Sequence, residues 1–172
     1  MIKVLLHNIL RFMVLVGMQV FLFKNMGYYN LITPYPYILF LLLLPIGISN
    51  PTLYIIAFLT GLTVDAFHDT LGVHAAACVT LAWMRIIFLR ITLEAENHDA
   101  LTTPRLGMVS FRWFLPYILL TTLFHHLTLY LLATFTFRQF HYTLFSTIFS
   151  CIFTVLIILL FSLLTYRRRT RK

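Results

Sequence analysis

Residues 36–67 read PYILFLLLLPIGISNPTLYIIAFLTGLTVDAF, an apolar run interrupted in its middle by Gly47, Ser49, Asn50 and Pro51. An Asn-Pro pair initiates a turn, and proline suits the first position of a helix. The sequence therefore predicts two helices, 36–48 and 51–67. The thirteen residues of the first extend only about 20 Å as a helix, whereas a bilayer needs about 20 residues. We expect this helix to be tilted, kinked at Pro45 or part of a re-entrant pair.

Four further apolar runs have the length of a membrane span, at 4–23, 72–91, 113–135 and 143–165. Of the 172 residues, 60% are hydrophobic and 10% are charged, whereas soluble domains carry about 25% charged residues to solvate their surface. This composition excludes a soluble fold. The sequence predicts an all-α integral membrane protein with about six transmembrane helices in one compact bundle, residues 1–166, followed by a basic tail, 167–172.

The distribution of positive charge predicts the orientation of the bundle, because Lys and Arg accumulate in cytoplasmic loops. The chain has 13 Lys and Arg against 5 Asp and Glu, a net charge of +8. Six crossings with an inner N-terminus place eleven basic residues inside and two, Lys24 and Arg138, outside. Five crossings with an outer N-terminus give ten against three. Both alternatives put the C-terminus in the cytoplasm, and the basic residues lack any signature of nucleic-acid binding.

Polar side chains in the first and last helices are informative because such groups are costly in hydrocarbon. In the first helix, His7 and Arg11 are expected to snorkel to the inner interface while Gln19 bonds a neighbouring helix. The alternative is that this face, which also carries Asn8, belongs to a transport site. In the last helix, small hydroxylated residues recur on one face, which favours close helix packing. These residues are Thr143, Thr147, Ser150 and Thr154.

Two adjacent histidines, His125 and His126, lie in the fifth helix. Neighbouring positions on a helix diverge by about 100°, whereas a helical metal site uses an i, i+4 pair with carboxylates or cysteines. We therefore treat His125 as an intramembrane polar residue and expect no metal and no cofactor.

The densest polar cluster spans the end of the third helix and the start of the fourth, in GLTVDAFHDTLGVHAAACVTLAW, residues 61–83. Its candidates for structural or partner contacts are Gly61, Asp65, Gly72, His74 and Ala75. Asp65 lies a turn deeper than a helix cap requires, so a specific contact and simple capping both remain open. Close helix approach at the small residues is expected in either case.

The pattern Gly61, Asp65, Gly72, Ala75, preceded by the proline-led helix 36–48, resembles the MreD family of rod shape-determining membrane proteins. The N-terminal helix bearing Gln19 and the basic C-terminal tail are also similar. Many members have an acidic residue after the proline that precedes the second helix, and this chain has Pro34-Tyr35-Pro36-Tyr37 instead.

The resemblance implies a non-enzymatic scaffold of the bacterial cell-elongation machinery in the inner membrane, controlling cell shape and peptidoglycan synthesis. Its implied partners are the bitopic protein MreC, indirectly the elongation-specific penicillin-binding protein and a RodA-type synthase, and MreB filaments on the cytoplasmic side. It also implies a six-helix fold similar to the substrate-binding subunits, or S-components, of energy-coupling-factor transporters.

An S-component that takes up a vitamin or metal is the alternative function, with His68, Asp69 and His74 as pocket residues at the outer surface. An intramembrane enzyme is a weaker alternative, because no HExxH, P-loop or nucleophile-elbow motif is present. The tail residues satisfy the orientation rule and are also candidates for contact with lipid headgroups. These are Arg167, Arg168, Arg169, Arg171 and Lys172.

Overall fold

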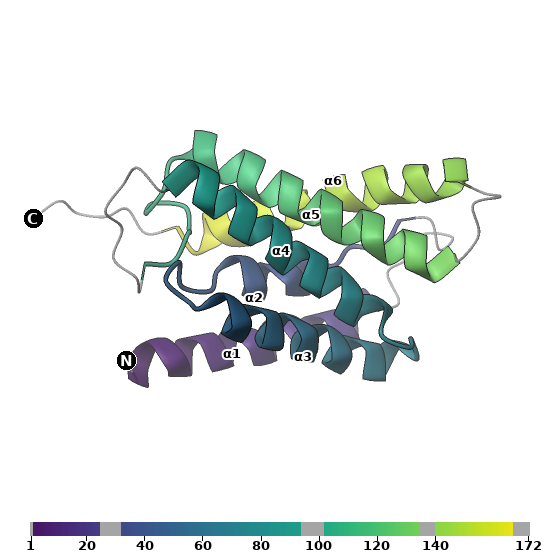
Figure 1. Cartoon of the computed structure of the whole chain (residues 1–172), viewed down its shortest axis with the longest axis horizontal. Helices are drawn as coiled ribbons and strands as arrows, with labels where there is room; N and C mark the ends of the chain where they lie inside the picture. Colours follow the sequence, from purple (N-terminus) through teal and green to yellow (C-terminus); the bar gives the residue numbers. More distant parts are fainter. Residues whose placement is uncertain (1, 25–31, 94–101, 135–139, 167–172) are drawn as a thin grey trace, which may run out of the picture.

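The computed structural model describes residues 2–24, 32–93, 102–134 and 140–166, and the regular structure in these ranges is helical (Figure 1). The predicted all-α class is confirmed. Five helical segments are long and apolar enough to cross a membrane, as in a multi-pass membrane protein. They are α1 (Ile2–Met18) continued by the π-helical turn η1 (Gln19–Phe23), α3 (Asn50–His68), α4 (Val73–Leu93), α5 (Phe111–Thr134) and α6 (Phe140–Leu164).

The predicted helix 36–48 is wrong in its length. Only residues 36–42 are helical, as the 3-10 turn η2 (Pro36–Ile38) and the single turn α2 (Leu39–Leu42). The helix stops there because Pro45 disfavours helical backbone at the residue before it. We call residues 33–45, which comprise this short helix and its non-helical flanks, the central segment. Figure 1 shows α2 between α1 and α3 on one side and α5 and α6 on the other.

The central segment connects two parallel helices, α1 and α3, and runs back along the bundle from the end of the first to the start of the second. In Figure 1, α1 and α3 run in the same direction, away from the end that holds the N-terminus. The Lys24 ammonium at the end of α1 donates to the carbonyl oxygen of Phe67 in the last turn of α3, which places these helix ends together. The chain between them must therefore return along the bundle, and it does so through the central segment.

The turn between α3 and α4 depends on residues with left-handed backbone. Asp69 ends α3 at φ 56° and Gly72 has φ 79°, conformations that Asp tolerates and Gly adopts freely. The two helices then approach so closely at Gly61 that an added Cβ would lie 2.6 Å from the Ala75 backbone nitrogen. A side chain at this position would force the backbones of α3 and α4 apart.

We predict that Gly61→Ala destabilises the bundle by about 1–3 kcal/mol, the usual cost of overpacking. Gly17→Ala in α1 is the matched control, because a Cβ added at Gly17 would meet nothing within 4 Å. Unfolding in mixed micelles, titrated with a denaturing detergent, measures both. Equal loss of stability in the two variants would contradict the close approach at Gly61.

Candidate functional site

The central segment is the most deeply buried part of the chain. Tyr37, Ile38, Leu41 and Leu42 have no exposed surface, and the flanks of the segment are not helical. A segment of this kind leaves backbone N–H and C=O groups without helical partners, and in a membrane interior each such group must be bonded within the protein. The polar side chains of four other helices supply those bonds.

At the carboxyl end of the segment, two arginines and a tyrosine bind successive backbone carbonyls. The Tyr117 hydroxyl donates to the Leu42 carbonyl at 2.8 Å, and Arg11 Nη1 donates to that of Leu43 at 2.9 Å. Arg85 Nη2 donates to the Leu44 carbonyl at 2.7 Å and to that of Pro45 at 3.1 Å. Carbonyls at the end of a helix carry partial negative charge, so the guanidinium groups are bound there without a carboxylate.

Arg85 completes this arrangement through a bond to Tyr117. Its Nε donates to the Tyr117 hydroxyl at 3.2 Å, and only 1% of the Arg85 side chain is exposed. An isolated buried charge is expensive, and several hydrogen bonds to its donors are needed to offset that cost. Arg85 therefore locks α4, α5 and the central segment together.

At the amino end of the segment, α6 and α1 supply the partners. The backbone N–H groups of Thr33 and Tyr35 each donate at 3.0 Å, to Ser150 Oγ and Thr154 Oγ1 respectively. Gln19 Nε2 donates to the Pro34 carbonyl at 3.4 Å. The small hydroxylated face of α6 thus packs against this non-helical backbone and also against α5, where Tyr130 bonds Ser150 and His126 bonds Thr154.

In the middle of the segment, Tyr37 joins α4 to α5. Its hydroxyl lies 3.1 Å from His74 Nδ1 and 2.9 Å from His125 Nε2, so it can donate to one imidazole and accept from the other. The next residue, His126, lies 3.0 Å from Thr154 Oγ1 through Nε2 and 2.9 Å from the Thr122 carbonyl through Nδ1. These side chains form a continuous buried network that links α4, α5 and α6 to the central segment.

Asp65 is a cap, although not of its own helix. Its Oδ1 accepts the backbone N–H of His74 at 3.0 Å and its Oδ2 accepts that of Ala75 at 2.9 Å. Thr70 also donates its hydroxyl to Oδ1. These N–H groups begin α4 and have no partner within the helix, and a carboxylate there also interacts favourably with the helix dipole. The depth of Asp65 follows from its reaching across to the neighbouring helix.

The structure brings together most residues that the sequence singles out. Gly61, Asp65, His74 and Ala75 pack in one corner of the α3–α4 hairpin, with Gly72 in its turn. Since Asp65, His74 and Ala75 are 2–3% exposed, they hold the two helices together and cannot touch a partner protein directly. The basic tail residues lie outside the described residues, as does Arg138.

The intramembrane polar residues converge on the central segment. Arg11 binds its Leu43 carbonyl, Gln19 its Pro34 carbonyl and His125 its Tyr37 hydroxyl. Asn8 accepts a 3.2 Å hydrogen bond from Arg11 Nη1 and so orients that guanidinium. Arg11 in α1 and Gln19 in η1 are therefore bonded to a neighbouring segment, which was the expectation for Gln19.

Sequence reasoning missed the structural roles of Tyr37, Arg85 and Tyr117. The orientation rule uses Arg85 only as a positive charge. The available signal was its depth, because Arg85 lies eight residues before the end of the apolar helix α4 at Leu93, too far in to be a loop residue. The two tyrosines could not be told from other apolar aromatic residues before the path of the central segment was known.

The chemistry that this arrangement supports is hydrogen bonding between helices. Among the residues that the structure describes, no group of three His, Cys, Asp or Glu side chains is placed to hold a metal ion. His68, at the end of α3, is half-buried, and its ring lies 5.1 Å from that of His74 between centroids. The Nδ1 atom of His74 is bonded to the Tyr37 hydroxyl.

Comparison of the chain with protein-family models, with curated proteins and with solved structures finds no match.

We predict that Arg85→Gln destabilises the protein strongly. A carbonyl left without a donor in the interior costs about 1–3 kcal/mol, and this substitution removes the guanidinium that serves both Leu44 and Pro45. Arg90→Gln on the same helix is the control, because Arg90 is exposed. Thermal unfolding of the detergent-solubilised protein should show a large shift for the first variant only, and similar shifts would disprove the capping role.

We also predict that Asp65→Asn lowers stability by about 1 kcal/mol, the typical value of a helix cap. The two N–H groups at the start of α4 are bound by different oxygens of Asp65, and Asn replaces one of those oxygens with an NH₂ group that cannot accept. Hydrogen exchange at the amides of His74 and Ala75 should accelerate. Asp69→Asn serves as the control, because Asp69 is exposed and Asn tolerates its left-handed backbone. Unchanged exchange in Asp65→Asn would contradict the assignment.

Proposed function

We propose that the chain is a non-enzymatic, MreD-like scaffold of the bacterial cell-elongation machinery that binds an MreC-type bitopic protein. The observation that carries this proposal is the use of the buried polar groups. Arg85, Tyr37 and Asp65 are bonded to backbone or to other side chains of the bundle. Groups engaged in this way hold helices in position and are not free to bind or transform a substrate.

The corner formed by α3 and α4 supports the MreD-like assignment. Three of the four residues that carry the resemblance form the contact between α3 and α4. Gly61 permits the close approach of the two helices, Asp65 caps α4, and Ala75 supplies one of the capped N–H groups. Gly72 provides the turn. The pattern therefore has a physical reason in this chain, which is the closure of a helical hairpin inside a membrane.

We further propose six crossings, of which the second is the discontinuous central segment. The parallel course of α1 and α3 supports it (Figure 1), because a chain that crosses twice in one direction must return in between. The N-terminal end of α1 and the C-terminal end of α6 then lie on one side. Arg90, in the last turn of α4, and Arg112, in the first turn of α5, lie toward that side. The positive-inside rule makes it the cytoplasm of a bacterial inner-membrane protein.

Helix α1 is the part of the bundle with the most room for a partner helix. In its span, Leu5–Phe23, 17% of the residues are buried, against 33–44% in the other four. A single-span protein such as MreC requires an accessible helix surface of this kind. We propose that this partner in turn links the chain to RodA-type synthases, penicillin-binding proteins and MreB filaments.

The decisive experiment is affinity purification of the full chain, expressed in a rod-shaped bacterium together with its MreC-type partner. We expect the single-span coiled-coil protein to co-purify at close to equal stoichiometry. Retention of a small vitamin, or of an ATPase module, would instead establish the S-component alternative. That alternative lacks support at the outer corner, where the His74 side chain is bonded to Tyr37.

We predict that Asp65→Leu reduces recovery of the partner and rescue of rod shape in cells depleted of their own MreD, because the α3–α4 hairpin loses its cap. Asp69→Asn should rescue like the wild type, since Asp69 is exposed and only ends α3. Full rescue by Asp65→Leu would contradict the importance of this corner for the scaffold.

A further inference from the structure

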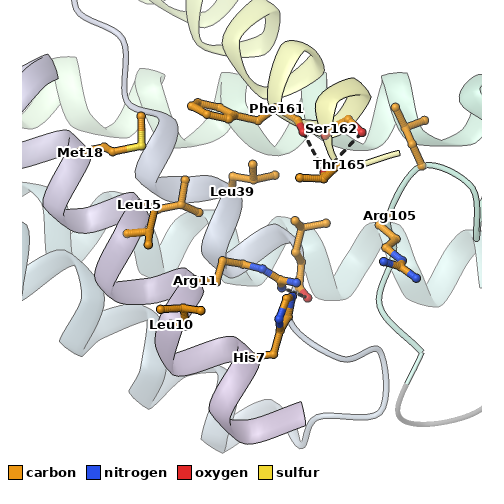
Figure 2. Close-up of a pocket in the computed structure, with 13 residues that line it drawn as sticks. His7, Leu10, Arg11, Leu15, Met18, Leu39, Arg105, Phe161, Ser162 and Thr165 are labelled. Atoms are coloured by element: carbon orange, nitrogen blue, oxygen red, sulfur yellow. Dashed lines mark hydrogen bonds between the residues drawn. The ribbon is translucent and has the colours of Figure 1, made fainter. Parts of the chain in front are cut away.

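A cavity of ≈410 Å³ lies between α1 and α6, at the end of the bundle that holds the N-terminus (Figure 2). It adjoins the central segment, whose Leu39 and Leu43 line it, and it is separate from the Asp65 corner. Leu10 and Val14 line it from α1, and both are at least half exposed. A cavity whose wall is itself exposed on a membrane-spanning helix opens sideways into the bilayer.

The cavity is polar at one end. Figure 2 shows His7 and the guanidinium groups of Arg11 and Arg105 there. A guanidinium has five N–H donors, and the hydrogen bonds described for Arg11 all leave from Nη1. The acidic residues within the described ranges, Asp65 and Asp69, lie at the opposite end of the α3–α4 hairpin. Two cations at one end of a cavity favour an anion there, and guanidinium binds phosphate particularly well.

The remainder of the cavity is apolar. Leu15 and Met18 continue along the same face of α1, and Phe161 faces them from α6 (Figure 2). From His7 to Met18 the helix rises about 16 Å, so the apolar wall extends well into the hydrocarbon region. A free phosphate would gain no favourable contact from this apolar wall, whereas an acyl chain would pack against it.

A buried hydroxyl lies between the two parts. Ser162 lines the cavity and is 7% exposed, and its Oγ has no hydrogen-bond partner within the described residues. A buried hydroxyl without a partner is costly. The Oγ atom is itself buried, so the Ser162 side chain must rotate toward the cavity before it can donate to a ligand. An ester carbonyl, which lies between the headgroup and the acyl chains of a glycerophospholipid, would then accept its proton.

We propose that this cavity binds one anionic glycerophospholipid from the leaflet on the side of the N-terminus. Arg11 and Arg105 hold its phosphate, Ser162 donates to an ester carbonyl, and one acyl chain lies along Leu15 and Met18. The bound lipid fills the gap between α1 and α6 and so fastens the most loosely held helix to the bundle. The proposal does not depend on the scaffold function.

The test is native mass spectrometry of the full-length protein, delipidated in detergent and offered equal amounts of phosphatidylglycerol and phosphatidylcholine. We expect one retained phosphatidylglycerol, at least tenfold preferred over phosphatidylcholine. Arg105→Gln should lower that preference at least fivefold. Arg105 is the variant of choice, because Arg11 also binds the Leu43 carbonyl and its loss could disturb the fold. Absence of any preference in the wild type would overturn the proposal.

Arg112→Gln is the matched control, because Arg112 is an exposed arginine at the same end of the bundle. It should leave the preference unchanged, and an equal loss in both variants would overturn the site by showing only general attraction to the surface. Val14→Trp fills the cavity from its exposed wall. It should abolish retention while the elution volume of the protein stays the same, and full retention would overturn the assigned position of the acyl chain.

Glycerol 3-phosphate and inorganic phosphate, each in hundredfold excess, distinguish the source of the anion. We expect neither to displace phosphatidylglycerol, because they lack an acyl chain. Displacement by either would show that the cavity binds a free phosphate and would overturn the lipid assignment.

Discussion

The carboxyl end of the central segment is the constraint on which the rest of the bundle depends. A chain that leaves the helical conformation at Leu43, inside a helical bundle, leaves carbonyls without helical partners, and these must be bonded by other groups of the protein. Arg85 and Tyr117 bind three of these carbonyls, at Leu42, Leu44 and Pro45. The position of α4 relative to α5 is fixed by this requirement, because both side chains must reach the same few carbonyl oxygens. The approach of α3 to α4 at Gly61 then aligns the preceding helix of the chain.

The need to bond buried backbone groups also explains why the buried polar side chains have structural roles. Each extended stretch of backbone in the interior takes up donors or acceptors from side chains, as Thr154 does for Tyr35 and Gln19 for Pro34. A small bundle with few such groups has little left for binding a ligand in its core. The cavity between α1 and α6 is different, since it combines two guanidinium groups with an apolar wall beside the central segment. Its properties suit the surrounding lipid, which is the solvent of this protein.

Several features could be predicted from the sequence because they depend on local patterns. The apolar runs indicated α1, α3, α4, α5 and α6, and the Asn50-Pro51 pair indicated the start of α3. The small face of α6 and the cluster around Asp65 were visible at helical spacing. The end of α2 was missed, although Pro45 marked it, because a continuous apolar run such as 37–44 favours an uninterrupted helix. The role of Arg85 was missed because the sequence alone does not distinguish an arginine in a loop from a buried arginine.

By itself, the sequence determined the class of the protein, its long apolar helices and the polar residues that had to be buried within them. These features follow from the free-energy cost of placing charged groups and unbonded backbone in hydrocarbon. That cost depends on the type of each residue and on its neighbours in the sequence. Only the tertiary structure decided the partners of those groups. Asp65 caps the following helix, Tyr37 joins two histidines, and Arg85 binds the end of a broken helix from 40 residues away. Such pairings depend on where segments distant in sequence come together, and no periodicity within one helix encodes that.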